Sequence, residues 1–241
     1  MPIAHHSPAS MRPRISAVFF DLDGTLYDRD AVVRLAVSDQ YARLRDRLNG
    51  VAPAQFVERV LDLDDHGYGD KPEIFRRLAR EWSLGIDVGL MTDTFWTCFL
   101  QRCDAPDDTI AALQELRRRG VGLGVITNGT VGLQQQKLER LGLASCFDEV
   151  LISEREGVSK PDPEIFRRAL ERSGVKAAEM AFVGDHPTID VAGARDAGLF
   201  PIWKSVPYWS RPAGDLLVVG QLREIVPGLF GDDRGLEDPR P

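Results

Sequence analysis

The first clear hydrophobic pattern along the chain is a short apolar run. The residues SAVFF at positions 16–20 end abruptly at Asp21. A run this short and this continuous is typical of a strand that is buried on both faces of a sheet. From about Asp30 to Cys103 the apolar residues recur with the helical period, as in PEIFRRLAREW, and no strand pattern interrupts them. We therefore predict one buried strand followed by a long helical insert.

After residue 104, strand and helix patterns alternate. Expected strands occupy 121–127, 149–153, 180–184, 200–206 and 215–220, and expected helices occupy 107–120, 131–142, 163–174, 188–198 and 221–230. Such alternation indicates βαβ units and a parallel sheet covered by helices on both faces. The predicted fold class is α/β, with a doubly wound parallel sheet as the core and an all-helical segment inserted after the first strand.

These patterns also predict the domain organisation. We expect a core domain made of residues 15–29 and 104–230, and a helical domain made of residues 30–103. Residues 1–14 are expected to be a disordered leader. Residues 231–241 combine glycine, proline and charge, and are expected to be a disordered tail.

Composition narrows the possible partners. The 241 residues carry a formal net charge of −7, which disfavours a nucleic-acid-binding surface. Three cysteines are too few and too scattered for a disulfide framework or a zinc site. No apolar stretch reaches the length of a signal peptide or a membrane span. We expect a cytoplasmic monomer or homodimer that has neither nucleic acid nor membrane as a partner.

Polar residues that carry chemistry stand just beyond the apolar runs. They form four groups: Asp21-Leu22-Asp23-Gly24-Thr25, Thr127-Asn128-Gly129-Thr130, Lys160-Pro161-Asp162, and Gly184-Asp185 with Asp190. In a parallel sheet the carboxyl ends of the strands meet at one edge, where α/β proteins bind ligands. The sequence therefore predicts that the four groups build one site.

The carboxylates of these groups predict a metal ion. Asp21 and Asp23 stand two positions apart in a segment leaving a strand, so their side chains point to the same side. At about 4 Å and an effective dielectric near 20, each pair of like charges costs roughly 4 kcal/mol, and Asp185 adds a third carboxylate. A bound cation or a raised pKa makes such a cluster tolerable. Without a His or Cys cluster, the donors favour a hard ion that prefers oxygen, and Mg²⁺ fits best.

The remaining residues suit phosphoryl transfer. Lys160, together with the ion, would offset the repulsion between a carboxylate and a phosphate dianion. Thr127 and the backbone N–H groups near Asn128 and Gly129 would hold the phosphoryl oxygens.

In this interpretation two aspartates perform the reaction. Asp21 would attack phosphorus and form an aspartyl-phosphate. Asp23 would protonate the leaving oxygen and later take a proton from the attacking water. The expected substrate is a small-molecule phosphomonoester.

The four groups resemble the motifs of the haloacid dehalogenase (HAD) superfamily. They occur in that order as DLDGTLYD, ITNGT, SKPDPEIF and VGDHPTID, and the resemblance extends from about Ala17 to Pro207. It implies a Rossmann-like core, with the helical insert as a cap that closes over the site and sets specificity. It also implies that Asp21 is the nucleophile, that Asp23 is the general acid and base, and that Thr127 and Lys160 bind phosphate. Mg²⁺ would be held by Asp21, Asp185 and the main-chain carbonyl of Asp23.

Each residue also has a structural interpretation when it is taken singly. Asp23 before a glycine is typical of a turn, and Thr127 or Asn128 of a helix cap. Lys160 before a proline is typical of an ordinary surface position. Asp190 would either reach the metal through water or favour a helix dipole as a first-turn acid. Taken jointly, the residues favour catalysis over these separate explanations.

The motifs also indicate a branch of the superfamily. The dehalogenase branch lacks the aspartate at position 23 and needs no magnesium, and the phosphonate-cleaving branch departs at the same place. The stretch TNGTVGLQQQKLERLGL resembles soluble pyrimidine 5′-nucleotidases, so a nucleoside 5′-monophosphate is a candidate substrate. A sugar-phosphate, acylneuraminate or phosphoglycolate phosphatase, a phosphomutase, and a catalytically idle protein that binds a phosphorylated ligand or a partner remain alternatives.

Features outside the motifs have two interpretations each. The polar, glycine-rich loop 64–71 either reads the substrate or is a solvent-exposed connection, which we favour. Phe95, Trp96 and Phe99 either stack on a base or form the core of the cap, as their helical spacing favours. His186 either ligates the metal or has a structural role or a role behind the metal ligands, and we favour the latter two because magnesium prefers oxygen ligands.

Overall fold

The computed structural model describes residues 14–214 and 216–231. The expected disordered leader and tail lie outside these residues, apart from Arg14 and Gly231. The helices are α1 Arg29–Leu44, α2 Pro53–Asp64, α3 Lys71–Glu81, α4 Val88–Arg102, α5 Asp107–Arg118, α6 Val131–Arg140, α7 Ser153–Glu156, α8 Pro163–Ser173, α9 Gly193–Asp196 and α10 Ile225–Phe230. The strands are β1 Ala17–Phe20, β2 Gly122–Thr127, β3 Glu149–Ile152, β4 Met180–Gly184, β5 Phe200–Lys204 and β6 Leu217–Val219.

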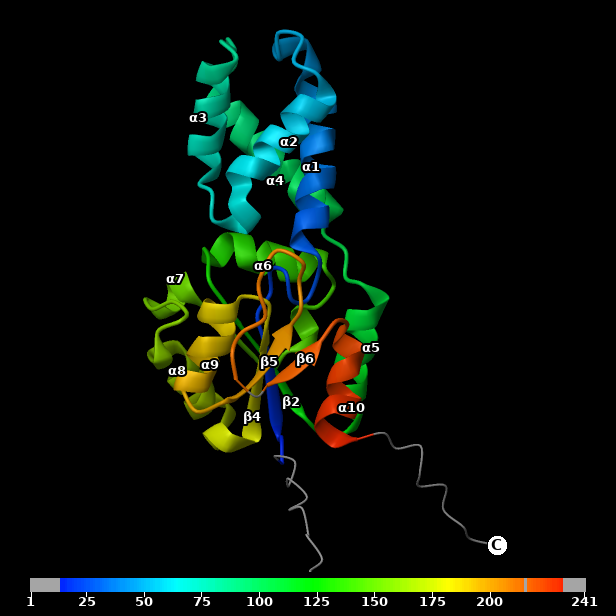
Figure 1. The fold of residues 1–241 in the computed structure, drawn as a ribbon, viewed down its shortest axis with the longest axis vertical. Coiled ribbons are helices and arrows are strands. Elements are labelled where there is room, and N and C mark those ends of the chain that lie inside the picture. Colours follow the sequence, from blue (N-terminus) through cyan, green and yellow to red (C-terminus); the bar gives the residue numbers. More distant parts are fainter. Residues whose placement is uncertain (1–13, 215, 232–241) are drawn as a thin grey trace, which may run out of the picture.

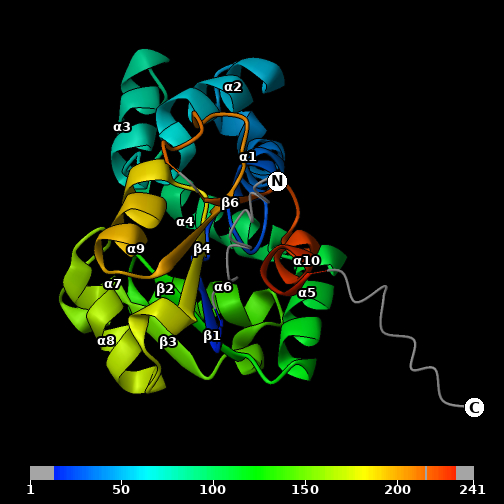
Figure 2. The ribbon, with the colours of Figure 1, turned by 60° about the horizontal axis from the view of Figure 1, so that its bottom comes forward.

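The strands form one parallel sheet in the order β3-β2-β1-β4-β5-β6. Because side chains alternate along a strand, β1 contributes to both faces of this sheet. Val18 and Phe20 join the hydrophobic cluster under α5, α6 and α10, whereas Ala17 and Phe19 join the cluster under α8 and α9. The two layers of helices are visible on opposite sides of the strands (Figure 2). The predicted doubly wound α/β core is confirmed.

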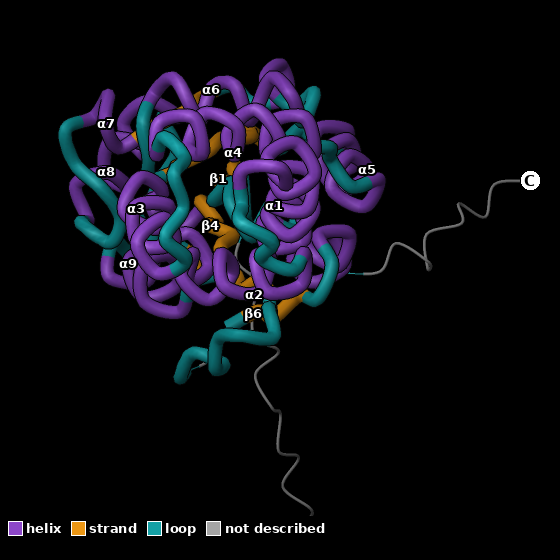
Figure 3. The backbone as a smooth tube through the Cα atoms, turned by 90° about the horizontal axis from the view of Figure 1, so that it is seen from above, coloured by secondary structure: helices purple, strands orange, loops and turns teal. Residues whose placement is uncertain are grey.

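An all-helical cap is inserted between β1 and β2. Helices α1–α4 pack on one another around fully buried aromatic rings such as Phe56, Phe75 and Phe95. Asp28, Asp70 and Asp87 cap the first turns of α1, α3 and α4 by accepting hydrogen bonds from backbone N–H groups. The cap stands over the carboxyl edge of the sheet (Figure 1), and the ends of β1 and β4 lie beneath it (Figure 3).

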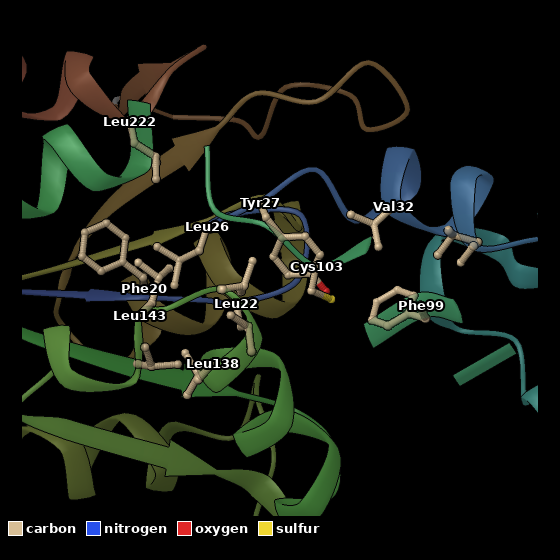
Figure 4. Close-up of a cluster of buried hydrophobic side chains, with 14 of the residues drawn as sticks. Phe20, Leu22, Leu26, Tyr27, Val32, Phe99, Cys103, Leu138, Leu143 and Leu222 are labelled. Carbon is tan, nitrogen blue, oxygen red and sulfur yellow. The ribbon is translucent and has the colours of Figure 1, made fainter. Parts of the chain in front are cut away.

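The cap and the core share one hydrophobic cluster. Figure 4 shows Phe20 and Leu22 on the core side and Val32 and Phe99 on the cap side, with Tyr27 and Cys103 between them. Tyr27 lies on the chain segment that enters the cap, and Cys103 lies on the segment that returns from it. Continuous packing across both connections places the underside of the cap directly over the strand ends.

One predicted helix has a different form. The segment expected to be a regular helix at 188–198 begins with a π-helical turn, Pro187–Ala192, which α9 then continues. The carbonyl of His186 accepts hydrogen bonds from the N–H groups of both Asp190 and Val191. The wider turn presents Asp190 to the strand ends, and such turns often occur at functional sites.

Two further observations concern the described residues. No helix between residues 14–214 or 216–231 is long and apolar enough to cross a membrane. Cys98, Cys103 and Cys146 are free thiols.

Candidate active site

The central strands bring the nucleophile candidate and the metal-ligand candidate together. Asp21 follows β1 and Asp185 follows β4, and these neighbouring strands mark the point where the strand order reverses. Ligands bind at such switch points, outside the carboxyl ends of the strands. Gly24 has a φ of +84°, and a Cβ at this position would lie 2.8 Å from Oδ2 of Asp185. Glycine therefore allows both the turn after Asp23 and the close approach of Asp185.

Lys160 lies between two of the buried carboxylates. Its Nζ is 2.5 Å from Oδ1 of Asp21 and 2.7 Å from Oδ1 of Asp190. Burial opposes its charge, but Asp190 and Asp21 together raise the pKa of Lys160 above its ordinary value. The side chain of Asn128 fixes the backbone of Lys160 by donating to its carbonyl and accepting from its N–H, both at 2.9 Å. Asn128 thus positions the lysine.

Three buried carboxylates are suitable for a cation. Oxygen atoms of Asp21, Asp185 and Asp190 all lie within 4.8 Å of one another, and Lys160 is the ammonium among them. Burial and neighbouring charges raise the pKa of Asp21 to about 7 and that of Asp185 to about 8. The excess negative charge and the all-oxygen donor set fit Mg²⁺.

The polar neighbours separate the roles of Asp190 and Asp185. Both oxygens of Asp190 are engaged, Oδ1 with Lys160 and Oδ2 with the N–H of His186. The side chain of Asp185 accepts only one long hydrogen bond, 3.5 Å from the hydroxyl of Tyr208, among the described residues. Its carbonyl accepts from the indole of Trp203 at 2.7 Å. This geometry leaves Asp185 available to a metal and uses Asp190 to hold the lysine.

His186 has the expected structural role. Its Nδ1 accepts hydrogen bonds from the N–H groups of Thr188 and Ile189, at 3.1 and 3.0 Å. The imidazole therefore caps the first turn of the π-helical segment and has no free Nδ1 lone pair for a metal.

Asp23 is surrounded by donors that stabilise its ionised form. Nζ of Lys137 lies 2.7 and 2.8 Å from its two oxygens, and Nε2 of Gln134 lies 3.0 Å from Oδ2. The hydroxyl of Tyr27 also donates to Asp23, and Arg29 approaches to 4.0 Å. Although burial would raise the pKa of Asp23, Lys137 and Arg29 hold it well below its usual range. In this conformation Asp23 is held as a carboxylate, and the same contacts make it a weaker base.

Three of the predicted phosphate-binding residues lie where β2 ends. Thr127 is the last residue of the strand, and Asn128 and Gly129 follow it. The hydroxyl of Thr127 lies 2.5 Å from Nε2 of Gln134, so one amide contacts both Thr127 and Asp23. The N–H of Gly129 donates to Oγ of Ser153 at 2.9 Å. Thr127 and Asn128 line the same cavity as Asp21 and Lys160, so the structure brings all the predicted residues together.

Several polar residues of the site were not singled out by the sequence patterns. Gln134 and Lys137 are buried on one face of α6, and Arg29 and Lys71 are buried at the first positions of α1 and α3. The i, i+3 spacing of Gln134 and Lys137 was the available signal, because it places both on one face of a helix. In the sequence these residues belong to the stretch that resembles pyrimidine 5′-nucleotidases, and that resemblance does not indicate contacts with Asp23.

A cavity of about 590 Å³ lies between the cap and the core at these residues. Residues 66–71 line it, and Gly67, Tyr68 and Asp70 are also exposed, so the loop is both solvent-exposed and part of the cavity wall. A role of this loop in binding the substrate stays a prediction.

Phe95 and Phe99 are fully buried in the cap, as the core interpretation predicted, whereas Trp96 lines the cavity. Aromatic rings at the rim stack on each other, His66 on Tyr208 at 3.8 Å between centroids.

A family model described as haloacid dehalogenase-like hydrolase matches residues 15–198. The chain belongs to this family. The match covers the core strands that carry the four motifs and the whole cap, so the resemblance seen in the sequence is confirmed.

Relatives of this HAD hydrolase include named phosphatases. It is 32% identical over 196 residues to a ribulose-1,5-bisphosphate 5-phosphatase of Halopiger xanaduensis, covering 76% of this chain and 82% of the relative. It is 29% identical over 201 residues to the pyrimidine 5′-nucleotidase YjjG of Escherichia coli, covering 82% and 89%. A phosphoserine phosphatase of Thermus thermophilus is 49% identical over 119 residues, which span 48% of this chain and 47% of the relative.

The fold has close counterparts among solved structures. The HAD hydrolase YfnB of Bacillus subtilis, whose structure is described as bound to magnesium, superposes with a TM-score of 0.73 at 23% identity. The superposition covers 90% of this chain and 99% of YfnB. Both the sheet and the cap of this chain therefore have the arrangement found in a HAD hydrolase.

Proposed function

We propose that this chain is a magnesium-dependent phosphomonoester hydrolase that works through an aspartyl-phosphate on Asp21. The observation that carries the proposal is the buried set of Asp21, Lys160 and Asp185 at the switch point of the sheet, with Asp23 two residues beyond the nucleophile. An anionic nucleophile held by an ammonium and beside a cation site is suited to attack a phosphate dianion.

In the first half of the reaction, an oxygen of Asp21 attacks phosphorus. A bond from Asp21 to phosphorus forms, and the bond between phosphorus and the ester oxygen breaks. Asp23, turned from Lys137 toward the leaving oxygen and carrying a proton, delivers that proton, and the alcohol leaves. Lys160 and Thr127 hold the phosphoryl oxygens meanwhile.

In the second half, water attacks phosphorus and gives its proton to Asp23. The bond between phosphorus and the Asp21 oxygen breaks, which releases inorganic phosphate and restores the carboxylate. Lys137 and Gln134 keep Asp23 ionised before this step, and Asp23 accepts the proton after it has turned from Lys137. The proton taken here serves the next turnover.

Magnesium would be held by the carboxylates of Asp21 and Asp185 and by the main-chain carbonyl of Asp23. Bound there, it would offset negative charge on the phosphoryl oxygens during transfer. Asp190 would keep Lys160 in place.

The substrate class follows from the cavity and the relatives. We infer that residues 15–29 and 104–230 supply the chemistry and that the cap, residues 30–103, contacts the leaving group. A cavity of about 590 Å³ accommodates a small phosphorylated metabolite, such as a nucleoside 5′-monophosphate or a sugar phosphate. The named relatives act on molecules of this size.

The decisive experiment measures phosphate release from a panel of phosphomonoesters, with Mg²⁺ or with a chelator. Asp21→Asn should abolish turnover, because an amide oxygen is a far weaker nucleophile, while the circular dichroism spectrum stays unchanged. Asp93→Asn, at an exposed position of α4, is the matched control and should retain full activity. Undiminished phosphate release by the Asp21→Asn variant would contradict the mechanism.

A further inference from the structure

The cap side of the cavity contains buried basic side chains. Lys71, Lys137 and Arg29 all line the cavity, and their exposed fractions are only 5%, 5% and 7%. They come from three elements, α3, α6 and α1, which only the closed arrangement of cap and core brings together. Burying charged groups is costly, so each needs an anionic or polar partner.

Protein carboxylates satisfy Arg29 and Lys137. The two terminal nitrogens of Arg29 lie 2.7 and 3.1 Å from the two oxygens of Asp64, and one of them is 3.5 Å from Asp30. Lys137 contacts both oxygens of Asp23. Asp30 is also paired with His66, at 2.5 Å. These two cations therefore already have partners of their own.

Lys71, like Lys137, has two polar contacts among the described residues, but it shares its carboxylate partner with the guanidinium of Arg29. The ammonium of Lys71 pairs with Asp64, which Arg29 already engages through both oxygens, and donates to the carbonyl of Gly69 at 2.9 Å. An ammonium has three donors, so one is left after these two contacts among the described residues. Burial lowers the pKa of Lys71, and Asp64 only partly opposes this effect.

The loop before α3 holds this lysine against the cavity. Gly67 has a φ of +106°, and a Cβ there would lie 2.9 Å from Cζ of Arg29, so only glycine lets the loop lie flat on the guanidinium. Lys71 Nζ stands 5.7 Å from the ring centre of Phe95 and 6.0 Å from that of Trp96. Aromatic faces favour a cation at this distance. The ammonium is thus held in place beside the cavity.

Asp23 indicates the direction of the leaving group, because its proton must reach the ester oxygen. Lys137 contacts Asp23, and Lys71 lines the same cavity, where its charge interacts with that of Lys137. We propose that the leaving group of the substrate carries a second anionic group, a carboxylate or a second phosphate, and that Lys71 binds it. This inference rests on the proposed phosphatase function and adds the substrate class to it.

The aromatic residues of the rim do not favour a stacked planar ligand instead. The ring of His66 is covered by Tyr208 at 3.8 Å, and His186 lies 4.5 Å from Trp209. The first pair is stacked, so each ring covers one face of the other, and the second pair is tilted by 56°. These contacts among the rings close the rim between cap and core.

The test uses pairs of esters that differ in one anionic group. Phosphoglycolate is compared with ethyl phosphate, phosphoserine with phosphoethanolamine, and ribulose 1,5-bisphosphate with ribulose 5-phosphate. The wild type should turn over the more anionic member of at least one pair with a roughly 10- to 100-fold higher kcat/KM, as one charge-assisted hydrogen bond provides. The carboxylate pairs and the bisphosphate pair distinguish the two kinds of anion.

Lys71→Met should remove this preference, because kcat/KM should fall roughly 10- to 100-fold further for the more anionic member of a pair than for the less anionic one. Lys71→Arg should retain most of it, because the positive charge stays. Lys176→Met, at an exposed position outside the cavity, is the control.

The outcomes separate this proposal from the proposed function. If the wild type hydrolyses both members of every pair with similar kcat/KM, the Lys71 proposal is overturned and the phosphatase function stands. This outcome is measured on the wild type alone. An equal loss for both members of a pair in a folded Lys71→Met protein also overturns the Lys71 proposal. Failure to hydrolyse any ester overturns the phosphatase function, and this proposal with it.

Discussion

Single side chains of this site act through their neighbours. Asp23 has the identity that the motif predicts, but its ionised state depends on Lys137 and Gln134, which follow it by 114 and 111 residues in the chain. Gln134 also contacts Thr127, so one amide joins the acid and base to the phosphate-binding residue. The reactivity of Asp23 is therefore determined by helix α6.

At this scale we expect Lys137→Met to raise the pKa of Asp23 and to impair proton transfer, because Lys137 holds both oxygens of Asp23 in position. The loss of kcat/KM, which reports the first half of the reaction, should be roughly 10- to 100-fold for an alkyl phosphate, whose leaving oxygen needs a proton. It should be much smaller for p-nitrophenyl phosphate, because nitrophenolate leaves without one. Steady-state kinetics with both esters decides this. An equal loss for the two would show that Lys137 does not act through Asp23.

At the scale of elements, the start of α3 determines where Lys71 stands. Asp70 caps this helix by accepting a hydrogen bond from the N–H of Glu73 at 2.9 Å, and Lys71 is the first helical residue. The hydrogen bond of Asp70 therefore stabilises the first turn of α3 and, with it, the position of Lys71 in the wall of the cavity.

We expect Asp70→Ala to lower the free energy of unfolding by about 1 kcal/mol, as the loss of a helix cap usually does. For a domain of this size, that is a fall in Tm of roughly 2–4 °C in a thermal melt. Asp93→Ala, in the middle of α4 and exposed, is the matched control and should cause no such fall. Equal melting temperatures for Asp70→Ala and the wild type would contradict a capping role.

For the whole molecule, the buried carboxylates connect stability to pH. Burial raises the pKa of Asp21 to about 7 and that of Asp185 to about 8, from 3.8 in both cases. A folded-state pKa above the unfolded value contributes stability that is present below about pH 4. That stability is lost as the pH rises toward 8, because the folded chain then gives up protons that it held more tightly.

Without metal, Tm should therefore fall between about pH 5 and pH 8, to the extent that these two groups contribute. Mg²⁺ competes with the protons, so it should raise Tm more at pH 8 than at pH 5. Thermal melts with chelator or with Mg²⁺ at the two pH values measure this, and Asp185→Asn should weaken the effect. An equal magnesium effect at both pH values would contradict a proton-coupled metal site.

The sequence alone determined most of the fold, because its signals are local. A short, continuous apolar run such as 16–20 is typical of a strand buried on both faces, and the change of period after Asp30 indicates helices wherever they pack. The motif residues were found for the same reason: they follow directly on the strands that place them. The helix expected at 188–198 differed in form because contacts of its first turn with the strand ends, not periodicity, decide its winding.

Only the tertiary structure decided which other residues join these motifs. Lys71 and Arg29 are ordinary charged residues in an amphipathic pattern, and their burial depends on how the cap packs on the core. Lys137 contacts Asp23 because α6 lies beneath α4 at the entrance to the cap. Periodicity reports which face of a helix is apolar, but it carries no information on which distant polar groups will meet across a cavity.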